Sequence, residues 1–297
     1  GSFTYAGQVF GYATAPVITV LAQDFANNTT TLYTGNWWRI TDAGLTGKSY
    51  SVASGTLDTS GVPGTDPVIS DAGSGSGTLT FSSGSGMFFT RTTPAAPFDA
   101  EIRLEINVLD SDGVGVVGNP VAFGAASAGN GISFNNGKQM RFGRLRLGNA
   151  NGSQLLPLPL QMQAQYWNST GTAFITNTAD SCTTIAAANI ALGNYQSNLN
   201  ACETTVTASS FSGGRATVLM GAPGSGNSGS VDLTVNLGAS GSGSSCVAGV
   251  ATAVTGANRA YLQGNWSGGA YDQNPSSRAT FGIYKGSEEI IHIRENF

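Results

Sequence analysis

The stretch FDAEIRLEINV, residues 98–108, constrains the fold more than any other part of this sequence. Apolar side chains occupy every second position from Phe98 to Val108, and mostly polar or charged side chains stand between them. Because successive side chains of a strand point to opposite faces, this pattern predicts a strand with one buried face. The same alternation recurs in residues 158–166, LPLQMQAQY, and in residues 231–237, VDLTVNL.

Gly-, Ser- and Asn-rich segments separate these runs, as in SDAGSGSG and GAPGSGNSGS. Many short strands divided by such turns predict an all-β protein with two antiparallel β-sandwich domains. We expect residues 1–130 to form an immunoglobulin-like sandwich and residues 131–297 a second sandwich. The alternation slips at Gly143, which predicts a β-bulge there. Residues 184–192, TIAAANIAL, are the best candidate for a short helix.

The last twenty residues, 278–297, contain two strand-like runs around KGSE. They predict a hairpin that closes the core of the second domain. The one histidine, His292, stands in this segment between two isoleucines, and its expected place is the solvated face of a strand.

Charged residues make up 10% of the chain, against roughly 25% in typical soluble domains. Together with 42 glycines, this composition favours an extracellular β-protein over a cytosolic enzyme. Residues 1–130 hold ten acidic and four basic residues, and residues 131–297 hold seven acidic and nine basic ones. Neither part has a basic run dense enough for nucleic-acid binding. No run approaches 18 apolar residues, so we expect no membrane span in this chain.

The chain has three cysteines, Cys182, Cys202 and Cys246. A disulfide between Cys182 and Cys202 is the leading prediction, because it closes a short loop in an oxidising compartment. Two alternatives stay open: Cys246 is a free thiol, or it is the true partner of one of the other two. Zinc is not expected, because there is no CxxC motif and His292 is remote.

The sequence nominates no catalytic residue. His292 has no nucleophile motif near it, and the Gly-Ser runs lack the ending of a phosphate-binding loop. Glu101 and Glu105 are acidic residues that a glycosidase could use, but they lie four positions apart on the polar face of one strand. A secreted glycosidase is therefore the weakest of three functional hypotheses.

The segment LDSDGVG, residues 109–115, resembles the start of a calcium-binding loop. Asp110 and Asp112 could direct alternate carboxylates at a cation, while Gly113 permits a tight turn. No further acidic ligands follow at the spacing of an EF-hand. Calcium is thus the one cofactor the sequence raises, and a metal-free turn capped by an Asp side chain is the competing interpretation.

Tryptophans provide the second candidate for a binding surface. Trp37 and Trp38 are adjacent, so in a strand one would point inward and the other outward. Trp167 lies on the glutamine-bearing face of its strand, and Trp266 lies in QGNWSGG. Exposed indole rings beside amide groups are typical of sugar-binding surfaces. The alternative interpretation places these rings in the core or under neighbouring loops.

Several blocks resemble one known family. They are the N-terminal segment FTYAGQVFGYATAPVITVLAQDFANNTTTLYTGNWWRI, FDAEIRLEINVLDSDGV, MRFGRLRLGNANGSQLLPLPLQMQAQYWN, FITNTADSCTTI and SRATFGIYKGSEEIIHIRENF. Together they resemble the C-terminal region of MshQ-type proteins, from the biogenesis cluster of the mannose-sensitive haemagglutinin (MSHA) type IV pilus. The resemblance implies a secreted, β-rich, non-enzymatic protein. It supports the Cys182–Cys202 pair, and it departs at Asn274, where the family pattern has Asp.

We therefore expect a structural or adhesive component of an MSHA-like pilus or surface apparatus, located outside a Gram-negative cell. The expected partners are pilus or minor-pilin proteins, with surface glycans as a further class. The alternative hypothesis is a secreted carbohydrate-binding module that uses Trp37, Trp38, Trp167 and Trp266 as ring platforms.

Overall fold

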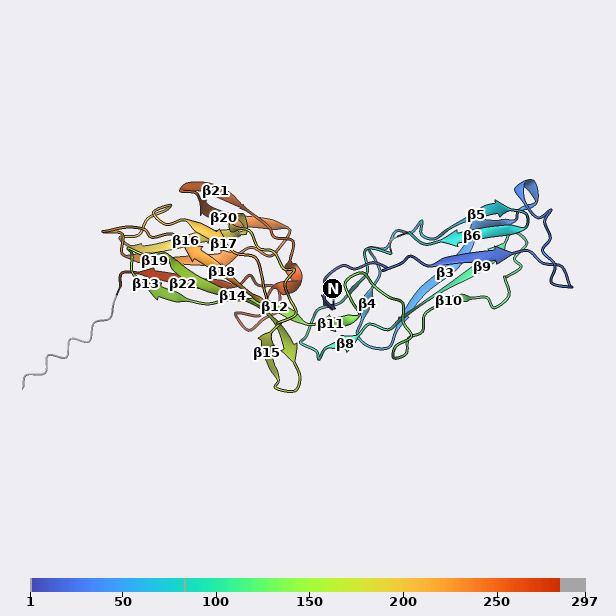
Figure 1. The fold of residues 1–297 in the computed structure, drawn as a ribbon, viewed down its shortest axis with the longest axis horizontal. Coiled ribbons are helices and arrows are strands. Elements are labelled where there is room, and N and C mark those ends of the chain that lie inside the picture. Colours follow the sequence, from blue (N-terminus) through green and yellow to red (C-terminus); the bar gives the residue numbers. More distant parts are fainter. Residues whose placement is uncertain (1, 83, 284–297) are drawn as a thin grey trace, which may run out of the picture. The chain divides into compact units, whose positions relative to one another are not determined.

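The computed structural model describes residues 2–82 and 84–283, and these form an all-β protein (Figure 1). Within them the helical segments are three-residue 3-10 turns: η1 (Gly35–Trp37), η2 (Ala187–Asn189) and η3 (Ala260–Leu262). None of these is long and apolar enough to cross a membrane. The predicted fold class is confirmed. The closing hairpin predicted at the C-terminus, with His292, lies outside the described residues except for its first strand.

The chain divides into two compact units. Unit 1 contains residues 1–144 and 166–175, and unit 2 contains residues 145–165 and 176–297. The sequence predicts a boundary near residue 130, in a segment rich in Gly and Asn. That segment is instead a loop of unit 1, because a buried carboxylate of the same unit holds it in place.

Unit 1 is built from short strands in several sheets. One sheet has the order β10-β9-β3, a second β2-β6-β5, a third β1-β11-β8, and β4 pairs with β7. The bounds are β1 (Phe3–Tyr5), β2 (Val17–Leu21), β3 (Ile40–Val52), β4 (Leu57–Asp58), β5 (Val68–Gly73), β6 (Ser76–Thr80), β7 (Phe88–Phe89), β8 (Phe98–Asp99), β9 (Ile102–Asp110), β10 (Val121–Phe123) and β11 (Gln139–Arg141). All pairs are antiparallel except β1 with β11.

The core of unit 1 lies between the β10-β9-β3 and β2-β6-β5 sheets. The alternating residues of β9 and its approach, from Ala100 to Val108, are almost fully buried. They pack in one cluster with Leu79 of β6 and with the inward side chains Ile18 and Ile69 of its neighbours. The period-two pattern of this segment therefore predicted its buried face correctly.

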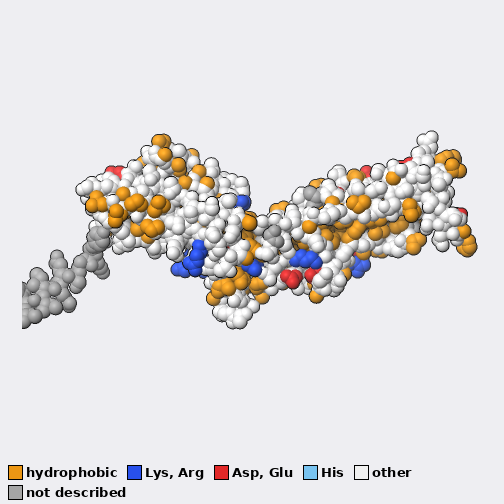
Figure 2. All heavy atoms as spheres, viewed as in Figure 1, with side chains coloured by type: hydrophobic (Ala, Val, Ile, Leu, Met, Phe, Trp, Pro, Cys, Tyr) orange, Lys and Arg blue, Asp and Glu red, His pale blue; other side chains and the backbone are white. Residues whose placement is uncertain are grey.

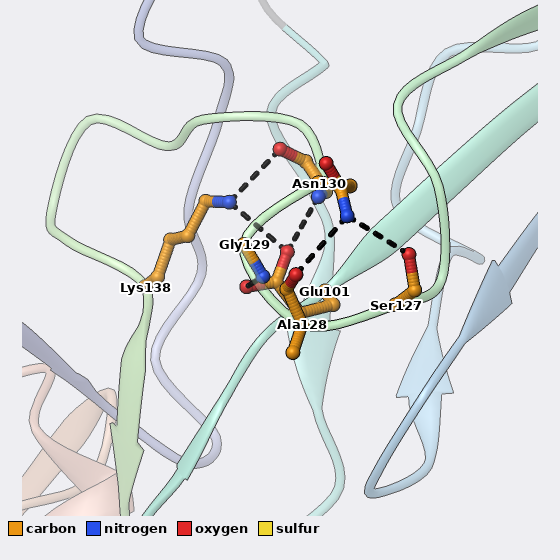
Figure 3. A network of polar contacts seen from close by, with 7 residues as sticks. Glu101, Ser127, Ala128, Gly129, Asn130 and Lys138 are labelled. Atoms are coloured by element: carbon orange, nitrogen blue, oxygen red, sulfur yellow. Dashed lines mark hydrogen bonds and ion pairs between the residues drawn. The ribbon is translucent and has the colours of Figure 1, made fainter.

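Glu101 is the exception in that pattern, because it is only 5% exposed although its position belongs to the polar set. Figure 3 shows why the charge is tolerated. Its Oε1 accepts a hydrogen bond from the backbone N of Gly129 at 2.9 Å, and its Oε2 accepts from the backbone N of Gly131. Lys138 Nζ lies 3.0 Å from the same Oε2 and also donates to the Gly131 carbonyl at 2.9 Å. A buried charge needs such partners to remain ionised.

These contacts set the pKa of Glu101. Burial alone would raise it, but the hydrogen bonds from Lys138, Gly129 and Gly131 lower the pKa below its ordinary value. Glu105 forms its own ion pair with Arg103 on the partly exposed face of β9. The two glutamates therefore have separate partners, and the carboxylate of Glu101 serves to anchor a loop.

Unit 2 contains two larger sheets. Their strand orders are β12-β14-β18-β17, where β15 also pairs with β14, and β13-β22-β19-β16-β20-β21. The bounds are β12 (Gly143–Leu147), β13 (Ala150–Gly152), β14 (Leu158–Asn168), β15 (Ala173–Thr176), β16 (Ile190–Ser197), β17 (Val206–Ala208), β18 (Arg215–Met220), β19 (Gly229–Val235), β20 (Ser240–Val247), β21 (Val250–Thr255) and β22 (Ser276–Phe281). Strands β12, β14 and β15 contribute residues to both units.

The expected alternation also holds in unit 2. In β14 the apolar side chains from Leu158 to Ala164 are buried, and in β19 those of Val231, Leu233 and Val235 are fully buried. The predicted irregularity near Gly143 is also present: β11 ends at Arg141, β12 begins at Gly143, and Phe142 between them is buried. Buried residues occupy even-numbered positions in β11 and at Phe142, and odd-numbered positions in β12.

Two predictions for unit 2 are wrong. The helix expected over 184–192 is only the short turn η2 followed by strand β16, whose residues pair with β19. The disulfide joins Cys202 to Cys246, with Cα atoms 5.4 Å apart, and Cys182 is an exposed free thiol. The closer spacing of Cys182 and Cys202 was misleading, because sheet pairing brings β20, which carries Cys246, beside β16 and its following turn.

Candidate functional site

The two best sequence candidates for a binding site meet at one end of unit 1. Arg39 follows the Trp37–Trp38 pair, and its carbonyl accepts a hydrogen bond from Ser111 N at 2.9 Å. The next residue, Ile40, is the register partner of Asp110. Pairing of β3 with β9 thus brings together segments that lie about 70 positions apart in the chain.

Trp37 and Trp38 differ in burial, although Trp37 ends the 3-10 turn η1 and Trp38 follows it, so neither lies in a strand. Trp37 is 68% exposed. Trp38 packs against the core of unit 1, and its ring centroid lies 5.4 Å from that of Tyr33. A Cβ on Gly77 would lie only 2.1 Å from the Trp38 ring, so glycine at position 77 makes room for the indole.

The Asp110–Gly113 segment forms a tight turn capped by its own carboxylate. Asp110 Oδ1 accepts hydrogen bonds from the backbone N of Asp112 at 2.9 Å and of Val114 at 2.8 Å. Gly113 has φ +80, a conformation that favours glycine. This is the geometry of the capped-turn interpretation. Among the residues described, no group of three His, Cys, Asp or Glu side chains is placed to hold a metal ion, and calcium binding by Asp110 and Asp112 stays a prediction.

A second carboxylate fixes the loop that carries Phe25. Asp24 Oδ1 accepts from the backbone N of Ala26 at 2.8 Å and of Asn28 at 2.9 Å, and its Oδ2 accepts from Asn28 Nδ2 at 3.1 Å. The hydrogen bonds from the side chain and backbone of Asn28, with that of Ala26, lower the pKa of Asp24. The loop is therefore held in one conformation, in which the ring of Phe25 is fully exposed.

A third carboxylate, that of Asp71 on strand β5, holds the turn η1 in place. Asp71, on β5, accepts hydrogen bonds through Oδ2 from Thr34 Oγ1 at 2.8 Å and from Gly35 N at 2.6 Å. Its Oδ1 accepts from Gly73 N at 2.8 Å. The backbone hydrogen bonds from Gly35 and Gly73, with the hydroxyl of Thr34, lower the pKa of Asp71.

We call this region the loop end; it comprises residues 22–39, the β5–β6 turn and the turn after β9. Figure 1 shows the first of these loops and η1 beside the β5–β6 turn, and Figure 2 shows hydrophobic atoms on the surface at that end of unit 1. The exposed apolar side chains are Phe25, Leu32, Trp37 and Val114. Soluble proteins seldom expose several large apolar groups together unless they contact a partner.

The charge of the loop end is acidic. Asp24 and Asp112 lie on its loops, Asp71 and Asp110 lie in the adjoining strands β5 and β9, and Arg39 is the basic residue of segment 22–39. Burial raises the pKa of Tyr33, as do the nearby carboxylates Asp110 and Asp112, against the hydrogen bond that its hydroxyl accepts from Arg39 N. Rings, aliphatic groups and carboxylates already engaged with backbone amides make a surface suited to contact with an apolar, basic partner.

The other two candidate tryptophans do not belong to the loop end. Trp167, on β14, has its ring 5.2 Å from that of Phe174. Trp266 lies in unit 2 and is 39% exposed. Its loop is held by Gln273, whose Oε1 accepts hydrogen bonds from Trp266 N and Ser267 N, both at 2.8 Å. Trp167 and Trp266 therefore have neighbours of their own, outside the loop end.

Asn274, where the resemblance implies Asp, is part of the framework of unit 2. Its Oδ1 accepts hydrogen bonds from Leu237 N at 3.0 Å and from Gln263 Nε2 at 3.2 Å. An amide oxygen and a carboxylate oxygen can both accept such bonds. The change from Asp to Asn therefore keeps the acceptor that this position needs.

Comparison with known protein families finds a match for each of two parts of the chain. Residues 1–137 match DUF6701, third domain, and residues 141–296 match DUF6701, fourth domain. The junction between these matches lies close to residue 144, where the first stretch of unit 1 ends. No curated protein matches the chain. The matched regions cover nearly the whole sequence, and the chain belongs to the DUF6701 family.

Proposed function

We propose that this chain is a non-enzymatic structural and adhesive component of a bacterial MSHA-like type IV pilus or related surface apparatus, and that it acts outside the cell. The observation that carries the proposal is the loop end, where Phe25, Leu32 and Trp37 are exposed on loops that Asp24 and Asp71 hold in place. A preorganised apolar surface loses little conformational freedom when it docks, which favours affinity.

The rest of the architecture supports a mechanical role. Antiparallel strands distribute load over rows of backbone hydrogen bonds. The Cys202–Cys246 disulfide closes a 44-residue segment of unit 2 and limits how far that segment can extend. The proposed partners are minor pilins, which would supply an apolar surface with a basic rim opposite the loop end.

The location is tested by immunoelectron microscopy with an antibody raised against this chain. We expect label on filaments or on the outer surface of intact piliated cells, and none on cells that lack the gene. Label confined to the cell interior would contradict the proposal.

A carbohydrate-binding module is the second candidate, and the 68% exposure of Trp37 is the observation that favours it. A glycan array with wild-type protein and the Trp37→Ala, Trp167→Ala and Trp266→Ala variants separates the two functions. Loss of a glycan signal in one variant would support sugar binding through that ring. Equal signals from all four proteins would exclude these tryptophans as platforms.

A further inference from the structure

Unit 1 contains a small pocket of about 140 Å3 with aromatic walls. Phe89, Phe98 and Phe142 line it, and the rings of Phe89 and Phe98 meet edge to face with centroids 5.2 Å apart. Sites for drug-sized ligands occupy roughly 300–1,000 Å3. This pocket is therefore of a size for one small ring, such as a single sugar residue of a longer chain.

Threonines are also among the residues that line this pocket. Thr56, Thr90 and Thr92 contribute to its lining and are exposed. A backbone hydrogen bond of 2.8 Å from Thr90 N to the Thr56 carbonyl joins the two segments that carry them. Each threonine hydroxyl can donate and accept, which matches the hydroxyl groups of a sugar.

A guanidinium group is fixed beside the pocket. The Cζ of Arg91 lies 4.6 Å from the ring centroid of Phe142, one of the pocket walls. Its Nη2 donates to the Gly143 carbonyl at 2.8 Å. Stacking on an aromatic face orients the guanidinium group of arginine, and its N–H groups donate charge-assisted hydrogen bonds to carboxylates.

The aromatic surface continues from the pocket to a second arginine. The ring centroid of Phe174 lies 6.3 Å from that of Phe142, and the Cζ of Arg144 lies 3.9 Å from the Phe174 centroid. Trp167 packs against the same Phe174. All these residues belong to unit 1. A continuous set of contacts thus runs from Arg91 through Phe142 and Phe174 to Arg144.

The stretch of chain that supplies Phe142, Arg144, Trp167 and Phe174 is basic. From Val114 to Ala179 the sequence contains no Asp or Glu, but it contains Lys138 and three arginines. The acidic residue closest in sequence to the pocket walls is Asp99, which follows Phe98 on β8. Its side chain therefore points to the opposite face of that strand. Of the other carboxylates near the pocket in sequence, Asp58 accepts hydrogen bonds from Ser60 and Glu101 is paired with Lys138.

We propose that this pocket and the adjoining Arg91, Arg144 and Phe174 surface bind an acidic polysaccharide whose sugar residues carry carboxylates. One sugar ring enters the pocket, its apolar face on the phenylalanine walls and its hydroxyl groups on the threonines. Its carboxylate pairs with Arg91, and the next residues of the glycan follow Phe174 and Trp167 toward Arg144. This ligand and surface are separate from those of the loop end.

The test is calorimetric titration of the whole chain with tetragalacturonate, with its fully methyl-esterified form as the uncharged match. We expect the acid to bind at least tenfold more tightly than the ester, because charge-assisted hydrogen bonds to Arg91 are lost with the carboxylate. The ester binding as well as the acid, or no binding of the acid, would overturn the proposal.

Variants locate the site. Arg91→Gln and Arg144→Gln are each expected to weaken binding of tetragalacturonate about tenfold, and Arg91→Lys to restore only part of the loss. The matched control is Arg103→Gln on β9, which should change affinity less than twofold. An equal loss in Arg103→Gln would mean general charge attraction and would refute the site. The separate variant at 144 keeps the test decisive if replacement of Arg91 unfolds the pocket.

Two further experiments distinguish a sugar site at this pocket from nucleic-acid binding and from a sugar site at the loop end. A single-stranded oligonucleotide of equal charge should compete at least tenfold less well than tetragalacturonate, because its charges lie on backbone phosphates and not on the ring that enters the pocket, and full competition would contradict a sugar site. Trp37→Ser, at the loop end, should leave tetragalacturonate binding unchanged. Loss of binding in that variant would move the glycan site to the loop end and refute the assignment made here.

Discussion

Asp71 and Gly35 lie 36 positions apart, yet the carboxylate of Asp71 accepts a hydrogen bond of 2.6 Å from the backbone N of Gly35. Through this bond and that from Thr34, the β5–β6 region determines how η1 presents Trp37. The exposed ring is thus positioned by a residue that is not its neighbour in sequence. If the loop end is a docking surface, its rigidity depends on this contact.

Asp71→Ala should release η1 while leaving the fold of unit 1 intact. We expect hydrogen exchange at the Gly35 amide to accelerate by about tenfold, because its acceptor is lost. Nuclear magnetic resonance measures this directly. Asp58→Ala is the matched control, since Asp58 caps a different exposed turn through Ser60. Unchanged exchange at Gly35 would mean that Asp71 does not hold the loop.

Acid should destabilise the loop end, because the carboxylates of Asp24 and Asp71 stabilise it when they are ionised. The pKa values of Asp24 and Asp71 are lowered below the ordinary value of an Asp in the folded chain, so both carboxylates favour folding when ionised. Their contribution is fully present above the unfolded-state pKa and is lost as the pH falls through the lowered folded values. Fluorescence of Trp37 and Trp38 should therefore stay constant from pH 7 to about 5 and change only in strong acid. A transition near neutral pH would contradict this account.

Glu101→Gln should destabilise unit 1 by about 3 kcal/mol, because Lys138 loses its charged partner and the loop at 129–131 loses its anchor. Urea unfolding measures the change in the free energy of unfolding. The comparison is Glu105→Gln, whose ion pair with Arg103 is partly exposed and should cost less than about 1 kcal/mol. Similar losses in both variants would show that Glu101 has no special anchoring role.

The cysteine assignment gives a chemical prediction. Under denaturing conditions without reductant, one thiol should react, and peptide mapping should place it at Cys182. Replacing both Cys202 and Cys246 with Ser should lower the free energy of unfolding of unit 2 by about 4 kcal/mol, given the length of the closed segment. Cys182→Ser should have an effect below about 0.5 kcal/mol. Recovery of a Cys182–Cys202 peptide would overturn the pairing.

Gly77→Ala tests the inward placement of Trp38. A methyl group at position 77 would lie 2.1 Å from the indole and must displace it, which should cost about 1–3 kcal/mol. At Gly64 an added Cβ meets nothing within 4 Å, so Gly64→Ala is the control and should be nearly neutral. A neutral Gly77→Ala variant would mean that Trp38 is free to move.

The sequence predicts the strands of this fold better than their partners. The period-two runs of β9, β14 and β19 identify buried faces, because burial depends on local side-chain order. The pairing of β3 with β9, which unites the Trp37 and Asp110 segments, depends on contacts between distant positions and has no local signature. For the same reason the sequence favoured Cys182–Cys202 and could not select the Cys202–Cys246 pair from the alternatives left open.

Single residues also explain where the patterns fail. The alternation predicts that Glu101 is exposed. Its side chain is buried instead, because Lys138 and the backbone amides of Gly129 and Gly131 donate hydrogen bonds to its carboxylate. Residues 184–192 are the best candidate for a helical stripe in the sequence, yet Ile190 and Leu192 pair in a sheet with β19. Arg91 and the threonines of the pocket carry no motif at all, since a pocket wall is assembled from several strands.

The central claim is that the loop end is a contact surface for a pilus partner. It is tested most directly by cosedimentation of the purified chain with pili sheared from cells that lack this protein. A Phe25→Ser, Leu32→Ser and Trp37→Ser triple variant is compared with Val250→Ser, which removes an exposed apolar side chain of unit 2. We predict that wild type and Val250→Ser sediment with the filaments, while the folded triple variant is retained at least tenfold less. Equal sedimentation of the triple variant and wild type would contradict the account.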